Sequence, residues 1–451
     1  MMDLNNIKRV FLIGIGGIGM SGLARYFYQK GYVVCGYDKT PTGLTQTLIK
    51  EGICISYEDE SDLIPISFQQ KDNGTLIIFT PAIPADNKIQ KYFKNKGFEL
   101  FKRSQVLGMI SKDLFTIAVA GTHGKTTTSS LITHLLKSGD IDCSAFLGGI
   151  ATNYDSNLII GHSNIMVVEA DEYDRSFLTL YPNLAVITSM DADHLDIYGA
   201  EEQLHQSFHL FAKQVKDNGE LIFREGLNLE NGTTYALSSS AKAKGLNVRI
   251  ENGAFFFDFE NENTLIKDLK LGLPGRHNVE NAVAAVEIAL KMKLNPDQIR
   301  LGLASFKGVK RRFEYHVKDE KIYIDDYAHH PVELKACFEA VRSLYPTKKL
   351  TVIFQPHLFS RTRDFEKDFV EVLNTVDELI LLDIYPAREK PILGVTSQVL
   401  ANQMDSKKVR VCGKEETLEI IRNENPELLL TVGAGDIDTL VLPLKNVMSY
   451  V

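Results

Sequence analysis

Two glycine-rich segments contain residue types that bind phosphate groups, and the second is the more informative. It reads Gly-Thr-His-Gly-Lys-Thr-Thr-Thr at 121–128, follows the apolar run 115–120 and precedes a segment with helical spacing of leucine and isoleucine. In such a strand–loop–helix unit the lysine reaches the β- and γ-phosphates of a nucleotide, and the threonine hydroxyl binds Mg²⁺. Lys125 and Thr126 occupy these two positions. Val119 stands where the common form has glycine, so we expect a shorter variant of the nucleotide loop.

The first glycine-rich segment, Gly-Ile-Gly-Gly-Ile-Gly at 14–19, fits the pattern G-x-G-x-x-G between an expected strand and an expected helix. Glycines there let the backbone approach a diphosphate, whose charge then lies against helix N–H groups. Asp38 ends the next expected strand, at a spacing that suits a ribose hydroxyl. The motif predicts a diphosphate site but does not distinguish NAD from other diphosphates, such as a UDP-sugar.

A mononucleotide loop needs a carboxylate on a neighbouring strand to hold its metal ion. The sequence Glu-Ala-Asp-Glu at 169–172 follows the apolar run 164–168 and supplies one. Mg²⁺ prefers oxygen ligands in octahedral geometry, so Glu169 and the hydroxyl of Thr126 suit it. The alternative is that these acidic residues only solvate a loop.

His194 lies in the sequence Asp-Ala-Asp-His-Leu-Asp at 191–196, directly after the apolar run 184–190. A single histidine is usually structural. Because open α/β sheets bind ligands at the carboxyl ends of their strands, the position of His194 favours a functional role.

Polar clusters also occur in the last third of the chain. They are Arg276-His277-Asn278, Arg311-Arg312, Asp-Asp-Tyr-Ala-His-His-Pro at 325–331, and Gln-Pro-His-Leu-Phe-Ser-Arg-Thr-Arg at 355–363. Asn278 could instead be the N-cap of a helix over 279–290, and the paired arginines could solvate a linker. Several such clusters at strand ends, together with two phosphate loops, predict one large cleft between domains.

The elements that position these residues follow an α/β pattern. Short apolar runs rich in β-branched residues alternate with longer helical patterns, which is typical of parallel sheets with crossover helices. The expected strands are 10–15, 32–37, 75–80, 115–120, 164–168, 184–190, 350–354, 379–383 and 428–432. From 219 to 273 the helical period fades. There Asn231-Gly232 and Asn252-Gly253 are hairpin signals, so we expect an antiparallel excursion.

Composition limits the function classes. The 451 residues include 50 Lys+Arg and 58 Asp+Glu, a net charge of −8, which gives no general reason to bind nucleic acid or an anionic membrane. Five dispersed cysteines without a C-x-x-C pair indicate reduced thiols in a cytoplasmic protein. Lys8-Arg9 before the apolar stretch 10–24 resembles a signal peptide, but Gly14, Gly16, Gly17 and Gly19 interrupt that stretch. No apolar run is long enough to insert into a membrane.

Taken together, the motifs resemble the Mur ligases. The segments 14–24, 121–128, 169–172, 275–278 and 325–331 carry the resemblance, and 355–362 and 433–437 also fit it. It covers the whole chain in order. It implies three α/β domains: 1–111, Rossmann-like and binding the UDP-sugar; 112–315, a central P-loop ATPase domain; and 316–451, Rossmann-like and binding the amino acid and nucleotide.

The activity implied by the resemblance belongs to peptidoglycan precursor synthesis. With ATP and Mg²⁺, L-alanine is joined to the lactyl carboxylate of UDP-N-acetylmuramate through an acyl phosphate, and ADP and phosphate are released. The oligomeric state stays open between a monomer and a weak dimer.

The resemblance also implies a role for each residue of this chain that matches a position in the family motifs. The expected UDP-sugar contacts are Gly16, Gly17, Ile18, Gly19, Met20, Ser21 and Asp38. The expected ATP contacts are Gly121, Thr122, His123, Gly124, Lys125, Thr126, Thr127, Asn278 and Arg312. The expected catalytic residues are Lys125, His194, Asp326 and His329, the metal ligands are Thr126, Glu169 and His194, and the amino-acid contacts are His357 and Arg361.

The chain departs from the family pattern in two places. Many members carry a carbamylated lysine beyond the equivalent of His194, but 206–210 contains no lysine, so we expect none. Leu358-Phe359 stands where relatives often have Arg-Tyr, so no arginine acts from that position.

Three alternative functions each account for part of this pattern. A recycling ligase of the same family joins a whole tripeptide to the same sugar nucleotide, but the sequence at 191–196 favours addition of alanine. An NAD-dependent oxidoreductase explains 14–38 but leaves 121–128 without a role. A non-catalytic nucleotide-binding module explains both loops but not the polar clusters of the last domain.

Overall fold

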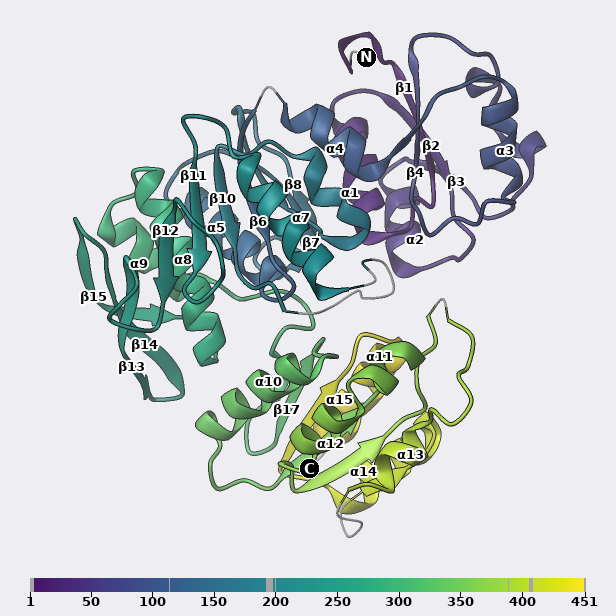
Figure 1. The fold of residues 1–451 in the computed structure, drawn as a ribbon. Helices are drawn as coiled ribbons and strands as arrows, with labels where there is room; N and C mark the ends of the chain where they lie inside the picture. The colour runs from purple at the N-terminus through teal and green to yellow at the C-terminus, as the bar shows by residue number, and fades with distance from the viewer. Residues whose placement is uncertain are drawn as a thin grey trace. The chain divides into compact units, whose positions relative to one another are not determined.

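The computed structural model describes residues 4–112, 114–191, 198, 200–387, 389–404 and 409–449. Each of three domains is built on one sheet, which confirms the three-domain α/β fold (Figure 1). By compactness the described residues form two units. One contains residues up to Leu246 with Phe259–Ile266 and Asn281–Leu303, and the other contains the remainder. The expected domain boundaries at 111/112 and 315/316 stay predictions.

The first sheet is parallel, with strand order β3-β2-β1-β4-β5. Its strands are β1 Arg9–Ile13, β2 Val33–Tyr37, β3 Cys54–Ser56, β4 Thr75–Phe79 and β5 Leu100–Lys102. Its helices are α1 Ile18–Gln29, α2 Gly43–Lys50, α3 Lys88–Asn95 and α4 Arg103–Ser111. The strand order reverses on either side of β1, so the first glycine loop, which follows β1, lies at the switch point where such sheets bind ligands.

The second sheet has ten strands in the order β15-β14-β13-β12-β11-β10-β6-β9-β7-β8. They are β6 Phe115–Ala120, β7 Ser144–Ala151, β8 Ser156–Ile159, β9 Ile165–Glu169, β10 Leu184–Ile187, β11 Glu220–Arg224, β12 Thr233–Ala236, β13 Ala243–Glu251, β14 Ala254–Glu260 and β15 Leu265–Leu271. The helices are α5 Lys125–Ser138, α7 Glu201–Lys213, α8 Arg276–Lys291 and α9 Pro296–Ser305. β6 pairs in parallel with both β9 and β10, so the loops after these three strands meet at one edge.

The third sheet has the order β16-β17-β21-β18-β19-β20, and only its edge strand β16 is antiparallel to its neighbour. Its strands are β16 Glu314–Lys318, β17 Ile322–Asp326, β18 Leu350–Phe354, β19 Glu378–Leu381, β20 Val409–Val411 and β21 Leu428–Val432. Its helices are α10 Pro331–Leu344, α11 Phe359–Asp364, α12 Glu366–Leu373, α13 Ser397–Ala401, α14 Lys414–Glu424 and α15 Val441–Ser449.

The antiparallel excursion occurs in the second part of 219–273. Asn252 and Gly253 have φ of 50° and 70° and join β13 to β14. Positive φ at both central residues is the signature of a type I′ hairpin, so these two strands are antiparallel as expected.

The hairpin expected at Asn231-Gly232 is wrong. β11 and β12 pair in parallel, with Ile222 opposite Thr233. A Cβ on Gly232 would lie only 2.5 Å from the carbonyl oxygen of Leu221, so glycine is needed there for close approach of two backbones.

The helix expected at 279–290 begins earlier, at Arg276. The side-chain Nδ2 of Asn278 donates to Pro274 O at 2.5 Å. Asn278 therefore lies inside the first turn of α8 and is not its N-cap.

The first glycine loop is held against the second sheet. One apolar core cluster contains Leu23 and Phe27 of α1 together with Phe146 of β7. Asn157 of β8, which is buried, donates from Nδ2 to Ile18 O at 2.6 Å. α1 and the loop before it are therefore packed directly on the second sheet.

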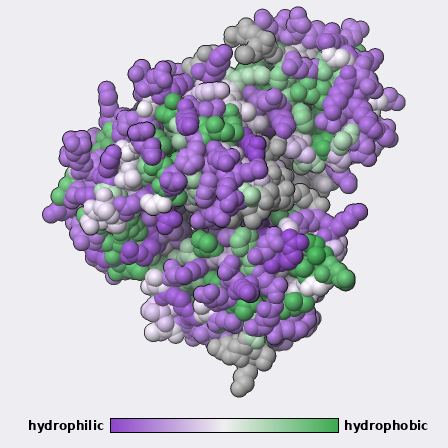
Figure 2. All heavy atoms as spheres, in the orientation of Figure 1, coloured by the Kyte–Doolittle hydropathy of each residue, from purple (hydrophilic) through white to green (hydrophobic). Residues whose placement is uncertain are grey.

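Hydrophilic residues cover most of the face drawn in Figure 2, and apolar residues lie there in separate patches. Among the described residues, no helix combines the length and apolar character needed to cross a bilayer.

Candidate active site

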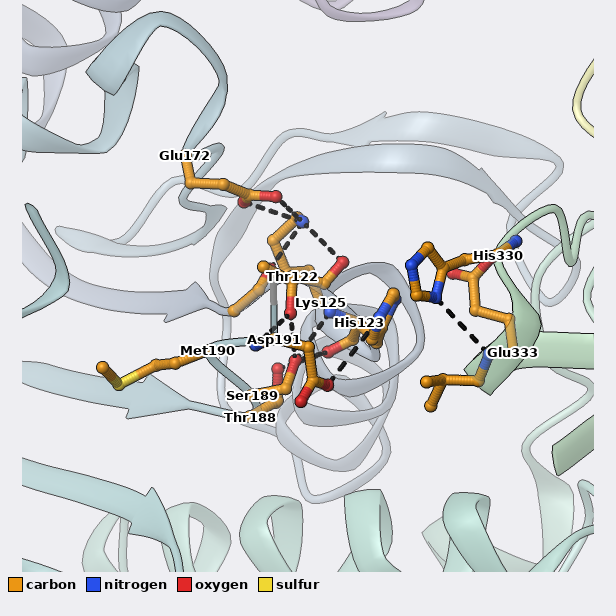
Figure 3. A network of polar contacts seen from close by, with 12 residues as sticks. Thr122, His123, Lys125, Glu172, Thr188, Ser189, Met190, Asp191, His330 and Glu333 are labelled. Atoms are coloured by element: carbon orange, nitrogen blue, oxygen red, sulfur yellow. Dashed lines mark hydrogen bonds and ion pairs between the residues drawn. The ribbon is translucent and has the colours of Figure 1, made fainter. Parts of the chain in front are cut away.

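The second glycine loop joins β6 to α5 and lies over the segment that follows β10. Gly124 has φ of 82° and Gly121 has φ of 136°, conformations that residues with a Cβ rarely adopt. His123 N donates to Ser189 Oγ at 2.7 Å, and the hydroxyls of Thr122 and Ser189 are 2.9 Å apart (Figure 3). These contacts fix the loop at the N-terminus of α5, whose dipole and N–H groups favour an anion.

Lys125, the first residue of α5, points toward Glu172 (Figure 3). Its Nζ lies 2.8 Å from Glu172 Oε2 and donates to Gly121 O at 2.6 Å. Burial alone would lower the pKa of Lys125, but the charges of Glu172, Asp171 and Glu169 outweigh it, and the pKa rises above its ordinary value. The lysine is therefore a charged group held at the loop.

Glu172 is a site residue for which no role was predicted from its position in the chain. Its side chain is 1% exposed, and burial raises its pKa to about 7, with Lys125 opposing that rise. The Glu-Ala-Asp-Glu segment was the available signal, but spacing along the chain did not show that the last of these acids pairs with the lysine.

Glu169 lies at the end of β9, where its Oε2 accepts from Gly148 N at 2.9 Å. Its charge contributes to the raised pKa of Lys125, so it lies within electrostatic reach of the loop. Thr126 is partly exposed on the first turn of α5, whereas Thr127 is buried. The Glu169 carboxylate and the Thr126 hydroxyl are hard oxygen donors, the kind that Mg²⁺ takes together with water and phosphate oxygens.

His194 lies outside the described residues. Within the part of the chain that the structure describes, no three histidine, cysteine or acidic side chains gather in a group that could hold a metal ion. The role expected of His194 as a metal ligand therefore stays a prediction.

The first glycine loop turns at Gly14, which has φ of 88°. Gly16 N donates to Asp38 Oδ2 at 2.7 Å, so Asp38 holds the loop in this structure. Gly17 is the N-cap of α1, and because glycine has no side chain, no side chain caps the N–H groups of the first turn. Met20 and Ser21 are buried, Ser21 Oγ donates back to Ile18 O, and Ser21 N donates to Gly17 O at 2.8 Å, so neither side chain is exposed at the loop.

Arg103 is a second residue that sequence reasoning missed. A Cβ on Gly19 would lie 2.7 Å from Arg103 Nη1, and Arg103 Nη2 lies 3.4 Å from Asp171 Oδ2. This cation thus lies beside the first glycine loop and also contacts the acidic segment that follows β9. Arg103 comes far behind the loop in sequence, at the start of α4, and no local motif pointed to it.

In the third domain, Asp326 ends β17 and is buried. Its carboxylate accepts from Phe313 N and Ala328 N, both at 2.7 Å. Burial raises the pKa of Asp326 to about 6, against the lowering effect of Arg312 and these two hydrogen bonds. Through these two hydrogen bonds, the Asp326 carboxylate connects the end of β17 to Phe313, the residue before β16.

His329 and Arg312 share the carboxylate of Glu333. His329 Nδ1 lies 3.2 Å from Glu333 Oε2 and 3.0 Å from Tyr327 O. Because both neighbours are acceptors, Nδ1 carries the proton and Nε2 is the basic nitrogen. Arg312 Nη1 lies 3.8 Å from Glu333 Oε1, and its guanidinium lies 4.9 Å from the centre of the Tyr327 ring.

The expected amino-acid contacts come together around His357. Arg361 Nη1 lies 3.3 Å from His357 Nδ1, so the arginine donates and leaves the proton of the imidazole on Nε2. Arg361 is buried, and the ring centres of His357 and His329 are 5.6 Å apart. The structure therefore brings His329 of the 325–331 cluster to His357 of the 355–363 cluster.

Tyr385 is a third missed residue. Its ring stacks on that of His357, with centres 5.8 Å apart and an interplanar angle of 17°. A Cβ on Gly435 would lie 2.6 Å from Tyr385 Cβ, so the glycine leaves room for the tyrosine. A single tyrosine after β19 gave no sequence signal, because the stacking partner lies in another loop.

The lowered pKa of His277 predicts that the free energy of unfolding depends on pH. Burial, assisted by the charge of Arg312, lowers its pKa from 6.5 to about 4. Between these values the unfolded chain binds a proton that the folded chain does not, so the free energy of unfolding falls as the pH falls. From pH 7 to pH 5 this contribution is at most about 2 kcal/mol, because the side chain is partly exposed.

We expect His277→Gln to reduce the loss of stability between pH 7 and pH 5 by up to about 2 kcal/mol. Urea unfolding at the two pH values, monitored by circular dichroism, measures this loss of stability. His162→Gln, at an exposed histidine, is the matched control and should leave the loss unchanged. An equal loss in wild type and His277→Gln would contradict the lowered pKa.

Comparison with known proteins adds independent findings. Three family models match the chain in order: the Mur ligase family catalytic domain at 9–114, the Mur ligase middle domain at 119–289, and the Mur ligase glutamate ligase domain at 311–435. The chain is 49% identical over 449 residues to a UDP-N-acetylmuramate–L-alanine ligase of Flavobacterium johnsoniae, and the match covers 99% of each chain.

Solved structures are similar over nearly the whole length. The UDP-N-acetylmuramate–alanine ligase of Thermotoga maritima matches with a TM-score of 0.82 at 25% identity, over 96% of this chain and 97% of the other. A murein peptide ligase of Psychrobacter arcticus matches with a TM-score of 0.69 at 19% identity, over 98% and 99%. At that identity the second likeness concerns the fold alone.

Proposed function

The chain belongs to the Mur ligase family, and from that membership we propose that it joins L-alanine to the lactyl carboxylate of UDP-N-acetylmuramate while ATP is cleaved to ADP and phosphate. The product is UDP-N-acetylmuramoyl-L-alanine, a precursor of peptidoglycan. The observation that carries the proposal is the presence of two phosphate loops of different design in one chain. The loop at 121–124 places a lysine at a helix N-terminus, and the loop at 14–19 has no lysine.

The first glycine loop is proposed to bind the diphosphate of the sugar nucleotide. The N-terminus of α1 offers N–H groups, and Arg103 supplies a positive charge beside Gly19. Asp38 is proposed to exchange its hydrogen bond with Gly16 N for one with the ribose. This assignment needs no redox chemistry, which an NAD-dependent enzyme would require.

In the proposed reaction an oxygen of the lactyl carboxylate attacks the γ-phosphorus of ATP, and the bond to the ADP oxygen breaks. Lys125 leaves Glu172 and neutralises charge on the transferring phosphoryl group. We propose that Thr126 and Glu169 hold Mg²⁺, which when bound neutralises phosphate charge. Asn278 and Arg312 are proposed to contact the nucleotide.

The amine of L-alanine then attacks the acyl carbon, and the tetrahedral intermediate collapses with loss of phosphate. Arg361 and the Nε2–H of His357 are proposed to bind the alanine carboxylate, with Tyr385 holding the His357 ring by stacking. The ammonium group of L-alanine must lose a proton before it can attack. We propose that Nε2 of His329, the basic nitrogen of the His329 imidazole, accepts this proton. We place the reaction in the cytoplasm, where dispersed, reduced cysteines are usual.

The acyl phosphate is tested by isotope transfer. With oxygen-18 in the lactyl carboxylate, we expect label in the released phosphate, because the carboxylate oxygen that attacks phosphorus leaves with it. Mass spectrometry of the phosphate measures this transfer. Label found only when the water carries oxygen-18 would show direct ATP hydrolysis and would exclude the intermediate.

The recycling ligase is the second candidate, and the amino substrate distinguishes it. Phosphate release should depend on L-alanine together with the sugar nucleotide. Release with the tripeptide L-alanyl-γ-D-glutamyl-meso-diaminopimelate but not with L-alanine would instead identify recycling.

A further inference from the structure

Two of the five cysteines lie side by side in the first sheet. Cys35 of β2 is paired with Cys54 of β3 in parallel register, and parallel strands lie about 4.8 Å apart. Residues directly opposite each other on neighbouring strands project from the same face of a sheet.

The two thiols differ in their access to solvent. Cys54 is exposed on β3, which is the edge strand of the sheet. Cys35 is 6% exposed and belongs to the apolar cluster of Phe11 and Tyr37. Burial raises the pKa of the Cys35 thiol to about 12, and Cys54 adds to that rise. A small oxidant therefore reaches Cys54 first and meets Cys35 only through it.

We propose that Cys35 and Cys54 are an oxidation site at which a peroxide forms a disulfide, and that this disulfide weakens binding of the UDP-sugar. The spacing of the strands satisfies the main requirement, because disulfides form between residues whose Cα atoms lie about 4.4–6.8 Å apart. The other cysteines lie in separate elements: Cys143 precedes β7, Cys337 is in α10 and Cys412 follows β20.

The chemistry balances with hydrogen peroxide as the oxidant. The sulfur of Cys54 attacks one peroxide oxygen, the O–O bond breaks, and sulfenic acid and water form. The sulfur of Cys35 then attacks the sulfur of Cys54, and a second water leaves. Two thiols lose two protons and two electrons, and the peroxide becomes two molecules of water. A dithiol reductant such as dithiothreitol reverses the bond by exchange.

The disulfide acts on the first glycine loop through Asp38. Asp38 N donates to Ser56 O at the end of β3 at 3.0 Å, and the Asp38 carboxylate holds Gly16 N at 2.7 Å. A disulfide brings its two Cβ atoms to about 3.8 Å, closer than the spacing of the strands, so the two side chains must turn toward each other and the edge strand twists locally. That twist moves the Asp38–Ser56 contact, and with it the residue that holds the loop.

The disulfide disturbs one hydrogen bond, that from Asp38 N to Ser56 O. Loss of one such bond corresponds to a rise of about 2- to 10-fold in the KM for UDP-N-acetylmuramate. This second half of the proposal rests on the proposed function of the first glycine loop, whereas formation of the disulfide does not.

The test uses the full-length protein treated with hydrogen peroxide. Thiol titration in denaturant should fall from five free cysteines to three, and peptide mass mapping should find Cys35 linked to Cys54. Dithiothreitol should restore both the thiols and the KM for UDP-N-acetylmuramate. The KM for ATP should change far less, because the ATP loop lies on another sheet.

Cys54→Ser is the decisive variant, because an exposed side chain tolerates the change without unfolding. It should keep its UDP-sugar KM after peroxide, while the matched control Cys412→Ser should respond as the wild type does. The proposal is overturned if no Cys35–Cys54 peptide forms, if the linked protein keeps its KM, or if Cys54→Ser is still inhibited. A reduced protein that does not bind the sugar nucleotide would refute the proposed function alone, since the cross-link is scored by mass.

Discussion

Lys125→Ala is expected to lower kcat by about 10³-fold or more, because a charge that neutralises a transferring phosphoryl group contributes several kcal/mol to the transition state. Affinity for UDP-N-acetylmuramate should stay within about twofold, since Lys125 is proposed to contact ATP and not the sugar nucleotide. The first glycine loop and Lys125 lie on different sheets. Steady-state kinetics and calorimetry with the sugar nucleotide measure the two effects.

Two further variants separate catalysis from folding. Removing Lys125 leaves the buried carboxylate of Glu172 without its partner, which is destabilising. The double variant Lys125→Met, Glu172→Gln removes both charges and should be as inactive as Lys125→Ala but better folded. Lys137→Ala, a lysine on the same helix that pairs with Asp142, should keep near-normal activity. Equal loss of sugar-nucleotide affinity and turnover in Lys125→Ala would contradict the division of labour between the loops.

Arg361→Lys is expected to raise the KM for L-alanine about 10-fold or more. Lysine keeps the charge but loses the planar fork that binds a carboxylate with two hydrogen bonds, and it also loses the contact with His357. A charge-assisted hydrogen bond is worth about 1.5–3 kcal/mol, which corresponds to that increase. The KM values for ATP and the sugar nucleotide should change far less.

Arg363→Lys provides the matched control for this prediction. Arg363 lies on the same short helix α11, but its side chain is exposed and pairs with Asp364. We expect its KM values to match those of the wild type. If Arg361→Lys instead raises the KM of all three substrates alike, the arginine organises the domain and the alanine site lies elsewhere.

Local patterns predicted most of the fold. The strands 115–120, 350–354 and 428–432 have the expected bounds, because short, nearly continuous apolar runs are typical of parallel strands that are buried on both faces. The turn at Asn252-Gly253 was also predictable, since positive φ favours these two residue types. At Asn231-Gly232 the same signal failed, because the glycine there permits a close backbone approach that only strand pairing creates.

The sequence by itself determined which residues carry the chemistry of the two phosphate loops. Gly14, Gly121 and Gly124 adopt backbone conformations set by local steric limits, and Lys125 follows as the first residue of its helix. Local rules therefore predicted these residues from their neighbours in the chain.

Only the tertiary structure decided what surrounds them. Glu172 beside Lys125, Arg103 beside Gly19, Tyr385 on His357 and Cys35 beside Cys54 are contacts between segments far apart in sequence. Such contacts depend on strand order and burial, which single-residue spacing does not encode. Because burial and neighbouring charge set the protonation of Glu172 and Asp326, the electrostatics of the site arise from the fold rather than from the motifs.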